Sequence, residues 1–509
     1  METISYNQPS TQAENIVVWL DFGPYAYINF GIISALSKLN KSNFIGIVTT
    51  RQDISFFQNQ QIIPFQKLIY YPGCYIGKSS FDLNNLKKFE EKFDLHIWLD
   101  VYAERSFYKY WTEFYKFTKD EILAIVEHSI SFFANVLETY KPKLILMQQA
   151  GENISNLLLY RIAKKMGIKI LMPNQVYLRN KIVISDNLIS REISDEFEKL
   201  IPNLSNSSEI YDTEFITNQD RSQSLTTMLN PPKFKRNFSQ FIDHYTKRLF
   251  TDPEPLYLNA GKTKLKMIRH RMQTRFETKK RKQFLDENSI TSIKDEKFLY
   301  FPLASEPEAR ILITSPFYTN QITLAENIAK SIPINFVLYV KEHPLQEIKS
   351  WRSIADYEKI INMPNVRLVH PTVKNQDLIS KSQGVIAISG STGFEAIFYK
   401  KPVILFVDEY YDVLPMVTKI KTLTTLSTDI ENVLLNFKFN AKELGVFMQA
   451  FNKHALTVPY HGIMNDGNIL SSIQRSEYDH NLTIQNFLNF YEKYKNHFEL
   501  IAQRIYSKL

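Results

Sequence analysis

The sequence of 509 residues contains a single cysteine, Cys74, which excludes an internal disulfide framework and a cysteine-based metal site. We find no apolar run that is long enough to predict a membrane-spanning segment. Residues 1–15 are polar and lack the basic and apolar regions of a signal peptide, so we expect none. These absences predict a globular protein of a reducing compartment, which we expect to be cytoplasmic.

Excess positive charge is confined to one stretch of the chain. The formal net charge is +8. Residues 262–282 hold ten Lys and Arg against one acid, Glu277, which gives +9 and leaves 8 − 9 = −1 for the remainder. In a uniformly basic nucleic-acid-binding protein the positive charge would be spread along the chain. No nucleic-acid recognition module accompanies the basic stretch. We therefore expect no nucleic-acid partner.

The basic stretch also carries apolar residues at helical spacing. Leu265, Ile268, Met272 and Phe276 form a narrow stripe, which predicts an amphipathic helix over Lys262 to Lys282. The commoner interpretation is a connector helix packed on a domain with a solvated basic face. The alternative is attachment to an anionic membrane surface, or to an acidic glycolipid acceptor, which would make the protein peripheral at the inner face of the membrane.

Most of the chain alternates strand and helix patterns, which predicts α/β domains with parallel sheets. We expect domains over residues 1–190 and 291–475, a connector over 191–290 and a C-terminal helix over 476–509. In the first half we expect strands over Ile16–Leu20, Leu95–Leu99 and Lys143–Gln148 and helices over Arg105–Phe117, Lys119–Tyr140 and Ile154–Lys165. In the second half we expect strands over Phe298–Phe301, Arg310–Thr314, Asn335–Val340 and Val366–Val369 and helices over Asn320–Lys330, Ser350–Ile361 and Asn375–Ser382.

The stretch Gly384 to Phe406 reads as strand, polar turn, helix and strand. Its turn, Ser389-Gly390-Ser391-Thr392, follows a buried strand, where open parallel sheets bind ligands. Small residues and the first free N–H groups of the next helix suit a phosphate. The alternative is a capping box between Thr392 and Glu395 that satisfies only the helix itself.

A second polar turn follows the strand that ends near Val340. Lys341-Glu342-His343-Pro344 would place a cation and an imidazole at the same edge of the sheet as the Ser389 turn. The proline halts the strand. Together, the two turns could hold a departing diphosphate or nucleotide monophosphate.

These motifs resemble those of the capsule polysaccharide biosynthesis family, which includes Kdo transferases. The resemblance rests on FPLASEPEAR (Phe301–Arg310), Gln321, YVKEHP (Tyr339–Pro344) and AISGSTGFEAIFYKKPVILF (Ala387–Phe406). The HP and Ser/Thr pair also looks like that of bacterial polysialyltransferases. The similarity is specific over Phe298–Tyr411 and faint in the N-terminal half.

The resemblance implies a GT-B fold, in which two Rossmann-like domains face a cleft and the C-terminal one holds a nucleotide-sugar donor. It implies no metal and no cofactor, and it favours a CMP-sugar of the Kdo or sialic-acid kind. Carried over by position, the donor-binding residues are Lys341, His343, Pro344, Ser389, Gly390, Ser391, Thr392, Glu395 and Glu308. His343 would contact the donor phosphate. The carboxylate of Glu395 would bind the ribose hydroxyls, but the capping box would use the same oxygens. The chain departs from the family in Gly390-Ser391, where a Ser or Thr pair is usual, and in Lys400-Lys401, where a glycine is common.

An inverting transferase also needs a base for the acceptor hydroxyl. Acids in loops at strand ends of the N-terminal half are Asp21, Asp100 and Glu152, of which we rank Glu152 first and Asp21 second. The predicted function is metal-independent transfer of a sugar to a capsule or other surface glycan or glycolipid acceptor. The alternatives are an epimerase, a polyol-phosphate transferase, or a non-catalytic assembly or export component.

Overall fold

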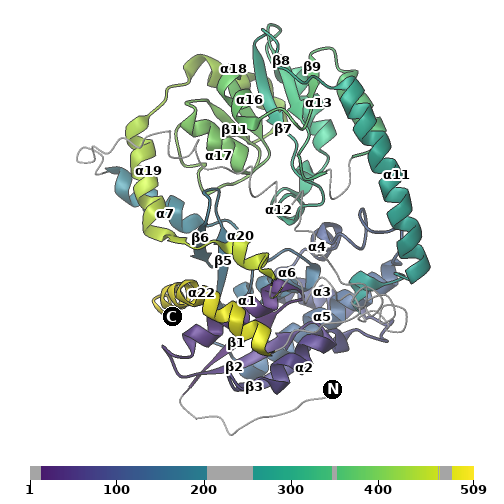
Figure 1. Ribbon diagram of the computed structural model, residues 1–509, viewed down its shortest axis with the longest axis vertical. Helices are drawn as coiled ribbons and strands as arrows, with labels where there is room; N and C mark the ends of the chain where they lie inside the picture. Colours follow the sequence, from purple (N-terminus) through teal and green to yellow (C-terminus); the bar gives the residue numbers. More distant parts are fainter. Residues whose placement is uncertain (1–12, 203–255, 347–351, 468, 470–483) are drawn as a thin grey trace.

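The structure is a computed structural model that describes residues 13–202, 256–346, 352–467, 469 and 484–509. Residues 203–255 of the predicted connector and Ser350, at the expected start of a helix, lie outside the described residues. Figure 1 shows two lobes, with the N-terminal sheet in the lower lobe and the second sheet in the upper one.

The lower lobe is built on a seven-stranded sheet in the order β13-β6-β5-β4-β1-β2-β3. Its strands are β1 (Glu14–Leu20), β2 (Ser42–Val48), β3 (Phe65–Tyr70), β4 (Leu144–Leu146), β5 (Lys169–Gln175), β6 (Lys181–Ser185) and β13 (Ala455–Thr457). Strands β1 to β5 are parallel, whereas β6 and β13 add an antiparallel edge. The helices are α1 (Pro24–Leu36), α2 (Arg51–Asn59), α3 (Leu83–Phe93), α4 (Ile97–Ala103), α5 (Lys119–Tyr140), α6 (Ile154–Lys165) and α7 (Arg191–Leu200).

The upper lobe contains a fully parallel six-stranded sheet in the order β12-β11-β10-β7-β8-β9. Its strands are β7 (Phe298–Pro302), β8 (Val337–Lys341), β9 (Val366–Val369), β10 (Gly384–Ala387), β11 (Val403–Leu405) and β12 (Val417–Lys419). The helices are α12 (Ala309–Thr314), α13 (Gln321–Ser331), α15 (Ile354–Ile361), α16 (Asn375–Lys381), α17 (Ser391–Phe398), α18 (Leu426–Asn436) and α19 (Ala441–His454). The sheet grows outward from β7 in both directions, which is the doubly wound Rossmann order. The predicted fold class, two Rossmann-like domains in the GT-B arrangement, is confirmed.

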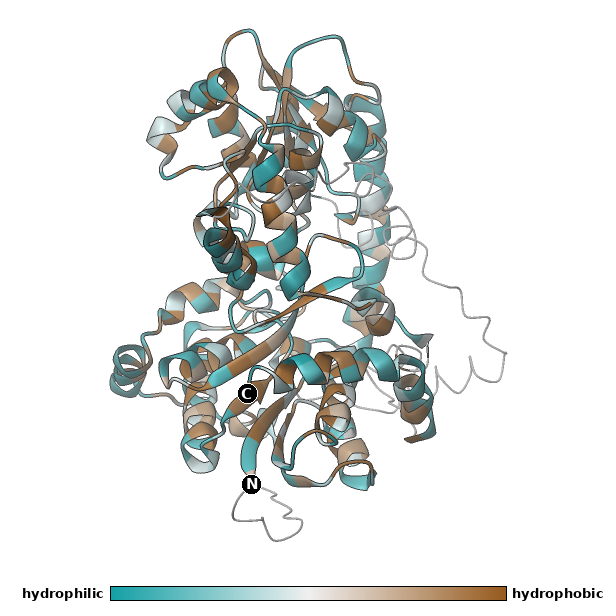
Figure 2. Cartoon of the chain, turned by 90° about the vertical axis from the view of Figure 1, so that its left-hand side faces the viewer, coloured by the Kyte–Doolittle hydropathy of each residue, from teal (hydrophilic) through white to brown (hydrophobic). Residues whose placement is uncertain are grey.

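Each sheet is buried on both faces, which explains the nearly continuous apolar runs of its strands. Ile16, Val18 and Leu20 of β1 belong to one core, and Val17 and Trp19 belong to the core on the opposite face. The residues of β7 divide between two cores in the same way. Figure 2 shows this pattern as brown strands inside both lobes and teal on the outward faces of the helices.

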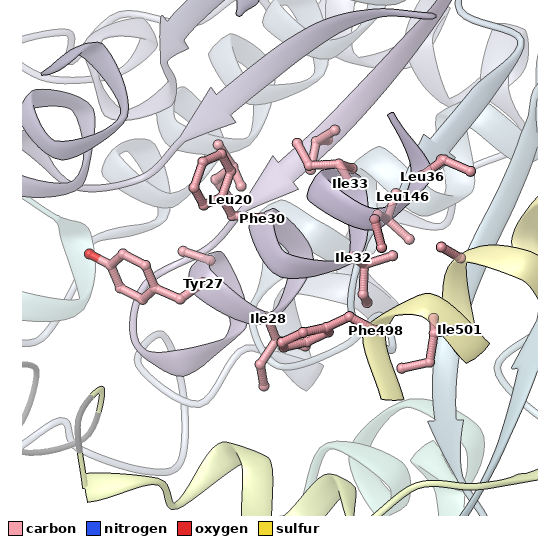
Figure 3. Packing of buried hydrophobic residues seen from close by; sticks show 14 of the residues in the cluster. Leu20, Tyr27, Ile28, Phe30, Ile32, Ile33, Leu36, Leu146, Phe498 and Ile501 are labelled. Atoms are coloured by element: carbon pink, nitrogen blue, oxygen red, sulfur yellow. The ribbon is translucent and has the colours of Figure 1, made fainter. Parts of the chain in front are cut away.

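The end of the chain returns to the lower lobe. After α20 (Tyr460–Met464), the long α22 (Ile484–Tyr506) packs against α1. Figure 3 shows Phe498 beside Ile28 and Ile32 of α1. A Cβ on Gly31 would lie 2.8 Å from the Phe498 ring, so glycine permits this close helix contact.

Three expected elements are wrong. Residues expected as a strand over Leu95–Leu99 enter α4, and those expected as a strand over Arg310–Thr314 form α12. Short apolar runs of this kind cannot be assigned by periodicity alone. The helix expected over Arg105–Phe117 is a series of turns and bends.

Among the described residues, α5 is the one helix that is long and apolar enough to cross a membrane, which corrects the expectation of no such run. However, 72% of its most apolar window is buried inside the protein. Buried helices of large cores pass the same test, so packing accounts for its composition.

The predicted basic helix is confirmed as α11 (Lys264–Asn288), which runs beside both lobes (Figure 1). At its start, Lys266 donates a hydrogen bond to the carbonyl of Phe114 in the lower lobe at 3.0 Å. Near its end, Phe284 stacks on Tyr357 and Leu285 is fully buried in the upper lobe. The helix therefore links the lobes through its two ends.

Candidate functional site

His343 lies just after β8, in the turn that carries Pro344. The backbone N–H of Leu345 donates to His343 Nδ1 at 3.1 Å. A ring nitrogen that accepts a hydrogen bond carries no proton, so this contact assigns the proton of a neutral imidazole to Nε2. The His343 side chain is thus arranged as an Nε2–H donor at the carboxyl end of the sheet.

The Ser389 turn follows β10 at the same end of the sheet, with β7 between the two strands. Gly390 stands immediately before α17 with φ 105°, a conformation that favours glycine. Among the described residues, no protein group forms a hydrogen bond with the half-buried hydroxyls of Ser389 and Ser391. The structure therefore leaves two hydroxyls beside the start of a helix, as a phosphate site requires.

The alternative interpretation of this turn, a capping box between Thr392 and Glu395, is wrong. The N-cap of α17 is Gly390, and no side chain caps the helix. Thr392 lies inside the first turn, where its hydroxyl is paired instead with the Asn375 amide at 3.3 Å. The carboxylate of Glu395 is consequently not used as a cap, and it interacts electrostatically with Lys341.

Lys341 is a buried cation behind the Ser389 turn. Its ammonium donates to Asn375 Oδ1 at 3.0 Å, and the same amide pairs with Thr392. Burial lowers the pKa of Lys341 to about 8, while Glu395 acts in the opposite direction. Because its side chain is only 5% exposed, Lys341 supports the turn from inside the domain.

Glu308, the remaining predicted donor residue, stands at the N-cap position of α12 without capping it. The charge of Glu308 acts on Arg310. Burial lowers the pKa of Arg310, but Glu409, Tyr177 and Glu308 raise it by more, so the net shift is upward.

A buried ion cluster, not anticipated from the sequence, holds the His343 turn in place. Arg352 pairs with Glu306 and, at 3.0 Å, with Glu342, whose side chain is fully buried. Gln321 donates to Glu306 at 2.8 Å and so joins α13 to the same cluster. The motif residues of FPLASEPEAR and YVKEHP are therefore joined through Arg352, which lies outside both motifs.

A second unanticipated group connects the lower lobe to the Ser389 turn. Tyr177, in the loop between β5 and β6, donates to Glu409 at 2.6 Å, and Arg310 donates to the Tyr177 hydroxyl. Glu409 accepts the backbone N–H of Gly390 at 2.9 Å, and Tyr411 donates to the Gly390 carbonyl at 2.8 Å. Both backbone polar groups of Gly390 are thereby fixed.

Asp21 follows β1 at the carboxyl edge of the lower sheet and is almost completely buried. Its carboxylate accepts hydrogen bonds from the amides of Gln148 and Asn153 and from the backbone of Phe22. Burial raises its pKa to about 6, although these hydrogen bonds oppose the shift. A cavity of about 10 Å³ adjoins it, which is room for about one water molecule.

Glu152 lies in the loop after β4, next to β1. Its carboxylate is 39% exposed and forms an ion pair with Arg105 at 3.3 Å. Asp100, by contrast, is on α4 and its carboxylate is paired with Arg161 at 2.9 Å, with 1% of the side chain exposed. Of the three candidate bases, Glu152 has the most accessible carboxylate.

The carboxyl edges of the two sheets meet in space. A Cβ on Gly151, beside Glu152, would lie 2.0 Å from Ile313 of α12. The Tyr110 hydroxyl donates to Glu306 at 3.1 Å, and Lys109 pairs with Glu306 at 3.6 Å. Loops of the lower lobe thus contact the ion cluster that supports the His343 turn.

Within the part of the chain that the structure describes, no group of three or more His, Cys, Asp or Glu side chains is placed to hold a metal ion. A hollow of about 250 Å³ lies between β12 and α18, and none of the predicted site residues lines it.

Asp21→Asn is expected to stabilise the protein more at pH 7 than at pH 4. Since the folded-state pKa of Asp21 is raised to about 6, the folded state binds more protons than the unfolded state between about pH 4 and 6, and stability falls as pH rises through that window. The asparagine variant has no carboxyl group to ionise, so its free energy of unfolding does not fall in this way. The difference is on the order of 2–3 kcal/mol.

Thermal melting at the two pH values measures the effect. The control is Asp94→Asn, whose carboxylate is 74% exposed and for which no such change is expected. An Asp21→Asn advantage that is the same at pH 4 and pH 7 would contradict the prediction.

Comparison with known families agrees with the motifs. Residues 219–429 match the family described as capsule polysaccharide biosynthesis protein. This region includes β7 to β12, the His343 turn and the Ser389 turn, so the predicted family resemblance is confirmed there. A search of curated proteins finds no match.

Solved structures similar to this chain include glycosyltransferases and epimerases. KpsC of Thermosulfurimonas dismutans, a beta Kdo 2,7 transferase, shares 13% identity at a TM-score of 0.32, covering 62% of this chain and 79% of that one. UDP-GlcNAc 2-epimerase of Methanocaldococcus jannaschii, in complex with UDP-GlcNAc and UDP, shares 13% identity at a TM-score of 0.25, covering 86% and 99%. The spinosyn rhamnosyltransferase SpnG, complexed with spinosyn aglycone, shares 9% identity at a TM-score of 0.26, covering 88% and 98%.

Proposed function

Because residues 219–429 match the capsule polysaccharide biosynthesis family, we propose that this protein is a glycosyltransferase that moves a sugar from a nucleotide donor to a surface glycan. The observation that carries the proposal is that two polar turns, one after β8 and one after β10, lie at the same edge of one sheet. His343 presents a proton on Nε2, and Ser389 and Ser391 stand at the start of α17. Such donors suit the negative charge of a leaving phosphate.

The donor side would stabilise the charge that develops as the bond between the anomeric carbon and the phosphate oxygen breaks. His343 Nε2–H and the Ser389 and Ser391 hydroxyls would donate to the phosphate oxygens. Buried Lys341 would add positive charge through Asn375 and Thr392. Donors that are fixed before the reaction stabilise such charge without reorganising. We propose a CMP-linked, Kdo-like or sialic-acid-like donor, with Glu395 near the ribose.

The acceptor side would supply the base. In direct displacement, an acceptor hydroxyl oxygen bonds to the anomeric carbon from the face opposite the leaving phosphate, and its proton passes to a carboxylate. We assign this role to Glu152, which is exposed at the edge that meets the upper lobe. Asp21 would instead position the loop that carries Glu152, since its carboxylate is enclosed by Gln148 and Asn153.

Calorimetry against CMP, UDP and GDP tests the donor site directly. We expect one nucleotide to bind the parent protein and to bind Ser389→Ala with Ser391→Ala at least about ten-fold more weakly, because two hydroxyl donors to a phosphate are lost. Ser507→Ala, on an exposed hydroxyl near the end of the chain, is the matched control. Binding of none of the three nucleotides would favour a non-catalytic assembly component.

Incubation with nucleotide sugars alone separates the enzymatic alternatives. An epimerase produces an isomerised sugar without an acceptor, whereas a transferase needs the acceptor for turnover. Isomerised product in the absence of acceptor would therefore replace our proposal with the epimerase alternative.

We further propose that α11 docks the protein on an anionic membrane at the cytoplasmic face, near a lipid-linked acceptor. Its apolar stripe is not packed on either lobe: Leu265 is 78% exposed, Ile268 57%, Met272 62% and Phe276 61%. The same helix carries the excess of Lys and Arg. Exposed apolar residues flanked by cations suit the surface of an anionic bilayer.

Met272→Glu combined with Phe276→Glu is expected to abolish binding to vesicles that contain phosphatidylserine, measured by co-sedimentation. Two carboxylates would repel the anionic surface and remove apolar area from the stripe. Leu435→Glu, at an apolar residue of α18 that is 81% exposed, should leave binding intact. Equal sedimentation of the parent protein with neutral and anionic vesicles would refute membrane docking by α11.

A further inference from the structure

Exposed aromatic side chains lie on the lower lobe, on α4 and in the following segment that carries Arg105, the ion-pair partner of Glu152. Trp98 is 48% exposed, Tyr102 57%, Tyr108 59% and Trp111 46%. We call these four residues the aromatic platform. Large rings are enriched where proteins contact ligands, because one side can be apolar while the other stays hydrated.

The platform residues lie on α4 and on the segment directly after it, residues 104–118. Trp98 and Tyr102 are four residues apart on α4, so they share one helix face about 6 Å apart along the axis. The ring of Tyr108 lies 4.6 Å from that of Tyr102 between centroids. The guanidinium of Arg105 lies 6.0 Å from the Trp111 ring centroid, within reach of a cation–π contact.

Trp111 is held in an unfavourable backbone conformation. Its φ is 54°, a left-handed value that is unusual for a bulky residue. Almost half of its side chain is exposed, so burial of the ring gains little in return. Local strain of this kind concentrates at ligand sites, which suggests that Trp111 is positioned for a contact outside the chain.

Arg105 joins the platform to the proposed base. It contacts Trp111 on one side and pairs with Glu152 at 3.3 Å on the other. Lys109, in the same segment, pairs with Glu306 of the upper lobe. The platform therefore begins at the carboxylate and lies next to the place where the two lobes meet.

We propose that the aromatic platform binds the glycan acceptor by stacking sugar rings on Trp98, Tyr102, Tyr108 and Trp111; this inference rests on the proposed transferase function. Pyranose rings have apolar C–H faces that fit exposed aromatic rings, and hydroxyls at their edges that can bond to Arg105 and Glu152. Neighbouring rings one helical turn apart suit successive sugars of an extended chain. A glycan seated there would deliver its end to Glu152.

An array of bacterial surface oligosaccharides, followed by calorimetry with the glycan that binds, tests the platform. We expect Trp98→Ala and Tyr102→Ala each to weaken glycan binding at least about ten-fold, as expected for a central aromatic contact. The affinity for CMP, UDP or GDP should stay at the parent value. Tyr506→Ala, at an aromatic residue of α22 that is 49% exposed, should bind glycan like the parent.

Two further outcomes separate this proposal from the transferase proposal. Nucleotide binding without binding of any arrayed glycan, or equal glycan binding by the platform variants and the Tyr506→Ala control, would overturn the platform alone. Glycan binding that depends on the platform without binding of any nucleotide would keep the platform and overturn the transferase. Melting temperatures near the parent value are expected for Trp98→Ala and Tyr102→Ala, because both side chains are exposed.

Discussion

His343→Ala is expected to lower the rate of sugar transfer by about 100-fold or more, the usual result of removing a hydrogen-bond donor to charge that develops in the transition state. The imidazole is held by the Leu345 N–H on Nδ1, which leaves the proton on Nε2. Alanine removes that donor and leaves the β8 strand unchanged. Donor consumption in the presence of acceptor is the measurement.

The matched control is His128→Ala, at a histidine of α5 whose ring forms a surface hydrogen bond with the carbonyl of Ser80 at 3.1 Å. It should transfer sugar at the parent rate. The melting temperature of His343→Ala should move little, since the side chain is half-buried and its described hydrogen bond is local. Turnover within a few-fold of the parent would show that His343 does not stabilise the leaving phosphate.

Arg352→Ala is expected to destabilise the upper lobe by about 3–5 kcal/mol, the usual cost of leaving buried charges unpaired. Arg352 is the cation that neutralises Glu306 and Glu342, and only 5% of its side chain is exposed. Burial raises the pKa of Glu306, but Arg352 and Lys109 outweigh burial and lower it overall. Urea unfolding measures the loss.

The pH dependence identifies the cause. A carboxylate with a lowered folded-state pKa stabilises the protein above its unfolded pKa and loses this effect as pH falls. The difference between the parent and Arg352→Ala should therefore shrink below about pH 4.5. Arg367→Ala, at an arginine that is 32% exposed and pairs with Glu296, should cost about 1 kcal/mol or less. A comparable loss in both variants would show that Arg352 has no special role.

The Arg352 cluster also shows what the motifs could not reveal. The motifs FPLASEPEAR and YVKEHP predict ligand-binding residues, yet Glu306 and Glu342 in these motifs pair with the same buried arginine. Local patterns identify residue types and turns, whereas ion pairs between distant segments depend on how the chain folds. The same limit applies to Tyr177, which reaches the Ser389 turn from the lower lobe through Glu409.

The sequence alone determined the doubly wound sheets and the positions of the His343 and Ser389 turns at their strand ends, because strands buried on two faces need continuous apolar runs. It also determined α11 as a helix, because its apolar residues recur at helical spacing. Only the tertiary structure decided that the stripe of α11 is exposed, that Gly390 is the N-cap of α17 without a capping box, and that Arg105 lies between Trp111 and Glu152. Exposure and caps depend on which surfaces pack together, and a one-dimensional pattern does not contain that information.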